Sequence, residues 1–276
     1  MRGAGDPTHQ RAADGFWRCS MTPEGPSTLQ IRREAGEVVG TAWGDGAATA
    51  LEWLPALLGS EDDPGAFDPA GHPLLVDAVR KRPGLRLGRT RSTWEALAPA
   101  VLEQRVTGKE ARRAWAGLVR KYGLPAPGPA PRGMYVAPPP NVWRRIPSWE
   151  WHKAGVDASR SITLVKAAGV ADRLEGLDSD RADSRLRSLP GVGVWTSAEV
   201  RQRAHGDPDA ISVGDYHLAS FVGWALLGEP VDDDAMVELL EPWRGQRQRV
   251  VRLLGAVVPP MERRGPRATI TDHRQN

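Results

Sequence analysis

The sequence has almost no cysteine and no long apolar segment. Cys19 is the only cysteine among 276 residues, which excludes an internal disulfide and any all-cysteine zinc or iron–sulfur site. We expect it to be a small buried apolar residue. No apolar run approaches the ~20 residues that span a bilayer, and residues 1–15 lack the apolar core of a secretory signal. These absences predict a soluble, cytoplasmic protein.

Charge is only mildly unbalanced. The formal net charge is +3, the isoelectric point is about 9.3, and arginine far outnumbers lysine. A positive excess suits a nucleic-acid partner, although genome base composition can produce the same bias. The densest basic segment runs from Arg80 to Arg91. It is equally compatible with a nucleic-acid contact and with a solvated surface loop.

The first third of the chain reads as a small α/β unit. Residues 1–15 are polar and show no periodicity, which indicates a flexible end. Residues 16–88 then form the unit, for which we expect a mixed sheet. It contains alternating strand-like runs and two amphipathic helical segments, at residues 28–32 and 37–43 for the strands and 47–58 and 74–82 for the helices.

From residue 89 to residue 258 the apolar spacing is helical almost throughout. A proline-rich stretch over residues 125–147 predicts an irregular crossing loop, and residues 259–276 predict a polar, flexible tail. The chain is therefore expected to be mainly α, with a small N-terminal α+β domain. The expected helices cover residues 93–107, 109–122, 159–168, 170–177, 180–188, 194–205, 215–227, 232–241 and 243–257.

The segment Leu189-Pro190-Gly191-Val192-Gly193 lies between two of these helices. Its two glycines allow a tight turn and close approach of another backbone. The amides of Gly191 and Gly193, together with the free amides of the next helix, would hold a DNA phosphate without reading sequence. An ordinary connection between two helices remains an equal alternative.

Asp215 follows Gly214 about twenty residues further on and opens a predicted helix. A carboxylate in that place is stabilised as an anion by the helix dipole and the free amides. Taken alone, the position is also typical of a residue that only caps the helix.

In this order and spacing, the hairpin and the aspartate resemble the helix-hairpin-helix (HhH-GPD) superfamily of DNA glycosylases. The resemblance is greatest to the bacterial 3-methyladenine DNA glycosylase II group, and it spans Phe16 to Val257. It is supported by the N-terminal α/β unit and by Val101–Thr107, similar to a helix that ends in Q-Q-V-S. Pro242-Trp243-Arg244 is similar to the P-W-R motif that opens the last long helix of that group.

The resemblance implies a base-excision repair enzyme that flips an alkylated purine out of double-stranded DNA and hydrolyses its N-glycosidic bond. Asp215 would be the catalytic carboxylate. Trp195 occupies the position where lyase members carry a lysine, so no amine can form a Schiff base and a monofunctional enzyme is expected. The resemblance also implies DNA contacts at Gly191, Val192, Gly193 and Thr196, and a base pocket formed by Gln104, Trp195 and Tyr216. It further implies an apolar wedge that fills the gap left by the flipped nucleotide, for which Leu124 is the candidate. Leu124 is equally compatible with simple packing at a helix end.

No cofactor is required, although the resemblance implies a monovalent cation, Na⁺ or K⁺, on the carbonyls of Arg187, Leu189 and Val192. The chain departs from the group at Gln104-Arg105, where the group has Q-Q, and near Arg252, where the last helix carries no aromatic residue. These departures leave two alternatives: a non-catalytic DNA-binding module, and a glycosylase for another purine lesion. A monomer associated with the bacterial nucleoid is expected.

Overall fold

A four-stranded antiparallel sheet is built from the first strands of the chain, in the order β1-β2-β3-β4. The strands are β1 (His9–Ala12), β2 (Gly15–Thr22), β3 (Gly25–Glu34) and β4 (Glu37–Trp43). The computed structural model describes residues 5–259, so the predicted tail beyond residue 259 lies outside the described residues. Two expectations are wrong here. The sheet is antiparallel throughout and not mixed, and β1 pairs with β2 inside the segment predicted to be flexible.

One face of this sheet is covered by α1 (Ala47–Leu57), which packs on β2, β3 and β4. On the sheet, Trp17 stacks on Trp43 with ring centroids 5.5 Å apart. Cys19 is buried, as predicted, in a small apolar cluster with Trp17, Met134 and Val136. Met134 and Val136 belong to the proline-rich segment over residues 125–147, which follows the start of β5 (Leu124–Pro125) and contains β6 (Tyr135–Val136).

A first group of helices surrounds α3 (Thr93–Leu102), of which every residue except Glu95 is buried. Its core contains a tryptophan stack, in which Trp143 lies 6.0 Å from Trp115 and 5.7 Å from Trp151 between ring centroids. The other members are α4 (Gly108–Tyr122), α5 (Pro140–Trp143), α6 (Ser148–Lys153), α7 (Ala158–Ala168), α8 (Ser179–Arg187) and α9 (Val194–Ala204). The helix expected over residues 170–177 is only a short 3-10 turn, η2 (Ala171–Arg173).

A second group contains α10 (Leu218–Leu227), α11 (Asp233–Leu240) and α12 (Arg247–Val257) around Met236 and Leu240. It also includes α2 (Pro73–Lys81), which packs on α12, although the sequence places α2 in the N-terminal unit. The P-W-R motif does not open α12. It forms the 3-10 turn η3 (Glu241–Trp243), and Trp243 Nε1 donates to the Asp68 carbonyl at 3.1 Å.

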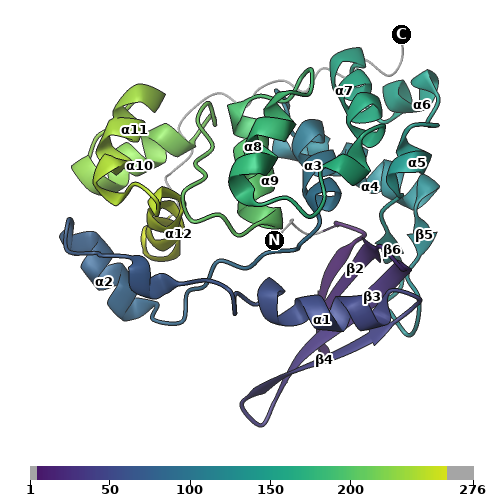
Figure 1. Cartoon of the computed structure of the whole chain (residues 1–276), viewed down its shortest axis with the longest axis horizontal. Helices are drawn as coiled ribbons and strands as arrows, with labels where there is room; N and C mark the ends of the chain where they lie inside the picture. The colour runs from purple at the N-terminus through teal and green to yellow at the C-terminus, as the bar shows by residue number, and fades with distance from the viewer. Residues whose placement is uncertain (1–4, 260–276) are drawn as a thin grey trace.

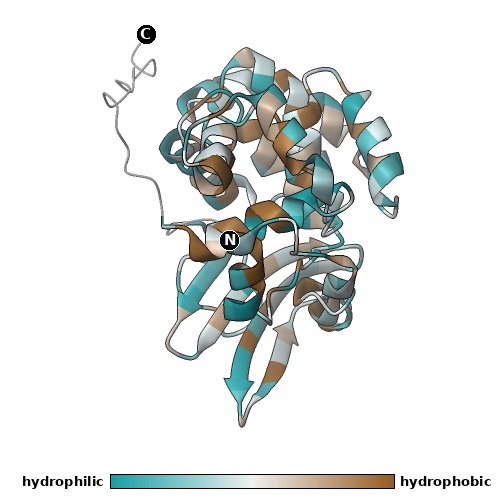
Figure 2. Cartoon of the chain, turned by 90° about the vertical axis from the view of Figure 1, so that its left-hand side faces the viewer, coloured by the Kyte–Doolittle hydropathy of each residue, from teal (hydrophilic) through white to brown (hydrophobic). Residues whose placement is uncertain are grey.

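The two groups of helices lie side by side, and most helices lie above the sheet (Figure 1). Figure 2 shows the same arrangement from the side, with hydrophobic and hydrophilic residues interspersed along the helices. Within residues 5–259, no helix is both long enough and apolar enough to cross a membrane. The connection from α8 to α9 lies within the first group, and the loop from α9 to α10 joins the first group to the second; the hairpin lies on the former and Asp215 on the latter.

Candidate functional site: a hairpin and a carboxylate joined by one helix

The predicted hairpin lies between α8 and α9. Val192 N donates to the Leu189 carbonyl at 3.0 Å and closes the turn, and Gly191 has a φ of +86°, which favours glycine. Gly193 is the N-cap of α9 and is exposed. The first main-chain bond of α9 runs from Ser197 N to Gly193 O at 3.0 Å. The amides of Val194 to Thr196 precede that bond, so they have no main-chain partner within α9, an arrangement that suits an anion.

Two neighbouring helices hold the hairpin in place. The Gln104 side chain, just after α3, donates from Nε2 to the Gly191 carbonyl at 2.9 Å and to Thr196 Oγ1 at 2.8 Å. Thr163 of α7 lies so close that a Cβ on Gly191 would be 2.1 Å from its Oγ1. Gln104 therefore bonds the hairpin itself, a role that the resemblance did not imply.

Two of the four predicted DNA contacts at the hairpin need a correction. Thr196 and Val192 are only 2% and 5% exposed, so neither side chain is available to DNA. Gly191 and Gly193 are exposed, as the prediction requires.

Asp215 lies in the loop between α9 and α10. Its Oδ1 accepts hydrogen bonds from His217 N at 2.9 Å and Leu218 N at 3.1 Å, and its Oδ2 accepts one from Trp195 Nε1 at 3.2 Å. One oxygen therefore caps α10, which begins at Leu218 and not at residue 215. The other oxygen contacts the first turn of α9. The structure thus brings Asp215 into contact with the helix that follows the hairpin, whereas only the order of the two motifs along the chain is evident from the sequence.

The loop that carries Asp215 is anchored to α9. Gln202 Nε2 donates to Ala210 O and to Ser212 Oγ, both at 2.9 Å, and Ser212 Oγ donates to Glu199 Oε1 at 2.5 Å. Glu199 and Gln202 were missed by sequence reasoning. The spacing of three residues puts them on one face of a helix, but nothing in the sequence identifies their partners.

A charged cluster holds the end of α9 to the same loop. Asp207 accepts hydrogen bonds from the Ser179 hydroxyl, from Arg201 Nη2 at 2.5 Å, and from the amides of Asp209 at 2.8 Å and Ala210 at 3.0 Å. Burial alone would raise the pKa of Asp207, but these bonds and the charge of Arg201 lower it below its usual value.

One aromatic and one apolar candidate of the site are exposed. Tyr216 is 91% exposed and meets the His217 ring edge-on, with centroids 4.7 Å apart. Packing in the core is therefore excluded for Tyr216. Leu124, the first residue of β5, is 44% exposed, and its role as a wedge stays a prediction.

Basic side chains of the segment from Arg80 to Arg91 form ion pairs within the chain. Arg80 and Lys81 pair with Asp77, and Arg89 and Arg91 pair with Glu61. These partners favour the surface-loop interpretation over a nucleic-acid contact. Among residues 5–259, no group of three or more His, Cys, Asp or Glu residues could hold a metal ion.

Solved structures share this architecture. A 3-methyladenine DNA glycosylase from Archaeoglobus fulgidus superposes with a TM-score of 0.72 at 18% identity, covering 89% of this chain and 88% of that one. An 8-oxoguanine glycosylase/lyase from Clostridium acetobutylicum gives a TM-score of 0.70 at 13% identity, covering 92% and 89%. The chain has the fold of the helix-hairpin-helix DNA glycosylases.

The chain is also similar to curated proteins. The chain is 30% identical over 228 residues to a probable bifunctional transcriptional activator/DNA repair enzyme AlkA from two strains of Mycobacterium tuberculosis. The match covers 78% of this chain and 45% of the relative, so the chain spans less than half the length of these proteins. No family model matches the chain. The resemblance to helix-hairpin-helix DNA glycosylases, predicted from the hairpin and the aspartate, is confirmed.

Proposed function

We propose that this chain is a monofunctional DNA glycosylase that removes alkylated purines from double-stranded DNA. The observation that carries the proposal is the contact between Asp215 Oδ2 and Trp195 Nε1. It places a carboxylate beside the first turn of the helix whose free amides suit a DNA phosphate. The likeness to AlkA and to the 3-methyladenine glycosylase of A. fulgidus supports the alkylated purine as the substrate.

DNA is bound first through its backbone. A phosphate is held by the main-chain amides around Gly193, which fixes the register without reading sequence. The glycosidic bond is inaccessible inside a duplex, so the damaged nucleotide turns out of the stack. Leu124, exposed at the end of α4, fills the gap left behind.

Breakage of the bond between base and sugar develops positive charge on the sugar. Asp215 is fixed by three hydrogen bonds to its two oxygens, so its negative charge faces the developing positive charge without reorganisation. The same carboxylate orients and activates the attacking water. An alkylated purine is itself cationic and leaves without a strong acid. The faces of Trp195 and the exposed Tyr216 suit a flat cation.

Two further parts of the proposal concern the hairpin and the assembly. The carbonyls of Arg187, Leu189 and Val192 are hard oxygen donors of the kind that Na⁺ or K⁺ takes. The Leu189 carbonyl already accepts the Val192 amide but keeps a second lone pair. A cation there would bridge the hairpin to a phosphate. We propose a monomer as the active form.

A second candidate is a glycosylase for another purine lesion. It is favoured by the likeness to the C. acetobutylicum 8-oxoguanine glycosylase/lyase and by the departures at Arg105 and Arg252. The lyase half of that activity is not available, because Trp195 offers no amine.

The test is release of free base from DNA treated with a methylating agent, measured by chromatography for the wild type, Asp215→Asn and the control Asp45→Asn. Asp45 is an exposed carboxylate in the turn before α1. We expect methylated purines from the wild type and the control, and a loss of about 10²–10³-fold in Asp215→Asn. Equal release by all three proteins would remove Asp215 from the mechanism. Binding without release by the wild type, extended to a panel of lesions, would leave a DNA-binding module.

A further inference from the structure

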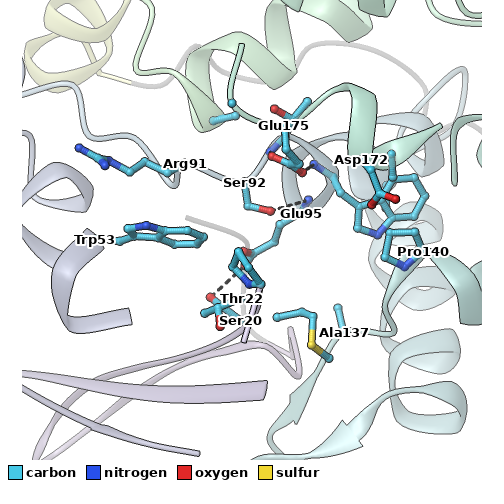
Figure 3. A pocket seen from close by; sticks show the side chains of 18 of the residues that line it. Ser20, Thr22, Trp53, Arg91, Ser92, Glu95, Ala137, Pro140, Asp172 and Glu175 are labelled. Carbon is cyan, nitrogen blue, oxygen red and sulfur yellow. Dashed lines mark hydrogen bonds between the residues drawn. The ribbon is translucent and has the colours of Figure 1, made fainter. Parts of the chain in front are cut away.

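A cavity of about 680 Å³ lies between the sheet and the first group of helices (Figure 3), and the hairpin does not line it. The two arginines of its lining, Arg89 and Arg91, are both paired with Glu61. Glu95, which also lines it, is paired with Arg18 at 2.9 Å. The basic side chains at the start of α4 differ from these, because they are exposed and have no such partner.

Three basic residues occupy one face of the first turns of α4. Lys109, Arg112 and Arg113 are exposed, and their spacings of three and four residues bring them together on the helix surface. We call these three residues the α4 patch. None of them forms an ion pair or a side-chain hydrogen bond with another residue among residues 5–259. In the segment from Arg80 to Arg91, by contrast, four basic side chains have acidic partners.

The charges of the α4 patch do not stabilise α4. Lys109 lies in the first turn, where the positive end of the helix dipole disfavours a cation, and like charges three or four residues apart repel each other. The Arg112 side chain turns back to the helix start, so that its Nη1 lies 3.1 Å from the place of a Cβ on Gly108. The carboxylate of Glu110 accepts hydrogen bonds from Thr107 N at 2.9 Å and Thr107 Oγ1 at 2.7 Å. Exposed cations that repel each other and lack a partner in the chain indicate an anionic partner outside it.

The α4 patch begins close to the hairpin. Gln104, in the turn between α3 and α4, donates from Nε2 to the Gly191 carbonyl at 2.9 Å. Lys109 follows five residues later, so at most about 18 Å separates the Cα atoms of Gln104 and Lys109. That distance corresponds to about five base pairs along a duplex axis. Arg105, in the intervening turn, is exposed and has no ionic partner among the described residues. A duplex held at the hairpin amides is therefore within reach of the patch.

We propose that the α4 patch is a second contact with the backbone of double-stranded DNA, on phosphates within about half a helical turn of the phosphate at the hairpin. The side chains bind by charge and do not read sequence, so the patch fixes the orientation of the duplex across the first group of helices. The inference rests on the DNA-binding part of the proposed function. It adds a surface that neither the hairpin nor the Asp215 loop contains.

The test is fluorescence anisotropy of a labelled, undamaged DNA duplex, titrated with the full chain at several salt concentrations. Each phosphate contact contributes about 0.9 to the slope of log affinity against log salt concentration. The triple variant Lys109→Gln/Arg112→Gln/Arg113→Gln should therefore lower the slope by about 2–3, and Arg113→Gln alone should lower it by about 1. Relative to 1 M salt, the slope change of the triple variant corresponds to a loss of about 10²–10³-fold in affinity at 0.1 M salt.

Arg33→Gln is the matched control for Arg113→Gln, since each removes one exposed arginine that forms no ion pair among residues 5–259. Arg33 lies near the tip of the β3–β4 hairpin, which projects away from the helices (Figure 1). Arg33→Gln should leave the salt slope of the wild type unchanged. All the replaced side chains are exposed, so the urea midpoint of every variant should equal that of the wild type. If the triple variant fails to fold, the comparison of Arg113→Gln with Arg33→Gln remains decisive.

Two outcomes would overturn the inference alone. One is that the variants of the α4 patch keep the wild-type slope, and the other is that Arg113→Gln and Arg33→Gln lower the slope equally, which would reduce the effect to overall charge. Base release from methylated DNA, measured separately on the wild type, tests the proposed function. If the wild type binds the duplex but releases no base, the proposed glycosylase fails, while a lower slope in the variants of the patch still supports the second DNA contact. A wild type that binds no duplex would overturn both.

Discussion

Gly191→Ala should destabilise the chain far more than Gly193→Ala, although the two glycines are two residues apart in one hairpin. Gly191 has a φ of +86°, where a residue with a Cβ is disfavoured by about 1–2 kcal/mol. The new methyl group would also lie 2.1 Å from Thr163 Oγ1. Thr163 is 4% exposed, so it cannot turn away freely, and overpacking adds about 1–3 kcal/mol. The free energy of unfolding should fall by about 2–5 kcal/mol.

Gly193→Ala is the matched control. Gly193 has a φ of −97°, and a Cβ there meets no atom within 4 Å. Replacement of a glycine N-cap by alanine should cost less than about 1 kcal/mol. Because Gly193 is exposed beside the free amides, its methyl group should instead weaken DNA binding.

Urea unfolding of the two variants and of Gly191→Ala/Thr163→Ala measures these energies. The double variant removes the hydroxyl group that clashes, but it keeps the left-handed backbone, so about 1–2 kcal/mol of the loss relative to Thr163→Ala alone should remain. If Gly191→Ala lies within about 0.5 kcal/mol of Gly193→Ala, the described packing of the hairpin on α7 is refuted.

Three more outcomes follow from the contacts of the site. Trp195→Phe keeps an aromatic ring but removes the N–H bonded to Asp215 Oδ2, so base release should slow by about tenfold or more at unchanged stability; an unchanged rate would show that the contact is dispensable. Leu124→Ala should slow base release and weaken DNA binding by less. Because the residue is 44% exposed, the free energy of unfolding should stay within about 0.5 kcal/mol of the wild-type value. A packing role for Leu124 would instead lower stability and leave base release unaffected. Asp207→Asn removes one of the two carboxylates that pair with Arg201 and should cost about 1–3 kcal/mol at pH 7. Because the pKa of Asp207 is lowered on folding, its contribution is present above the usual value of 3.8 and is lost as pH falls through the lowered pKa. Urea titrations at pH 7 and pH 3 should show a smaller difference in the free energy of unfolding between Asp207→Asn and the wild type at pH 3 than at pH 7, and a constant difference would contradict the assignment.

Local sequence patterns were sufficient to predict most helices and the β3–β4 hairpin. The helix expected from residue 109 begins at Gly108, because Thr107 and Glu110 form a reciprocal capping box. The helix expected over residues 93–107 ends at Leu102. Apolar spacing continues through Val106, but Arg105 adopts a φ of +54°, and no periodicity reveals that turn. Likewise α2 has an ordinary amphipathic pattern, and only tertiary packing decides that it pairs with α12.

The residues of the candidate site likewise fall into those that a local sequence pattern predicts and those that it does not. The hairpin and Asp215 could be found because each is a short motif whose residue types are demanded by backbone geometry and charge. Glu199, Gln202 and the bond from Gln104 to the hairpin could not, since these side chains act through partners 8 to 92 residues away. A polar side chain that holds a distant loop has the same local pattern as one on a solvated helix face.

Helix α9 links the two halves of the site, which are the free amides after the hairpin and the Asp215 carboxylate. The first turn of α9 presents the free amides and carries Trp195, which contacts Asp215. Its later turns carry Glu199 and Gln202, which hold the loop that leads to Asp215. A displacement of α9 therefore moves the phosphate site and the carboxylate together. Changes on the contacts of α9, such as Gly191→Ala, should weaken DNA binding and base release in parallel. Leu124 lies outside these contacts, so its replacement should separate the two.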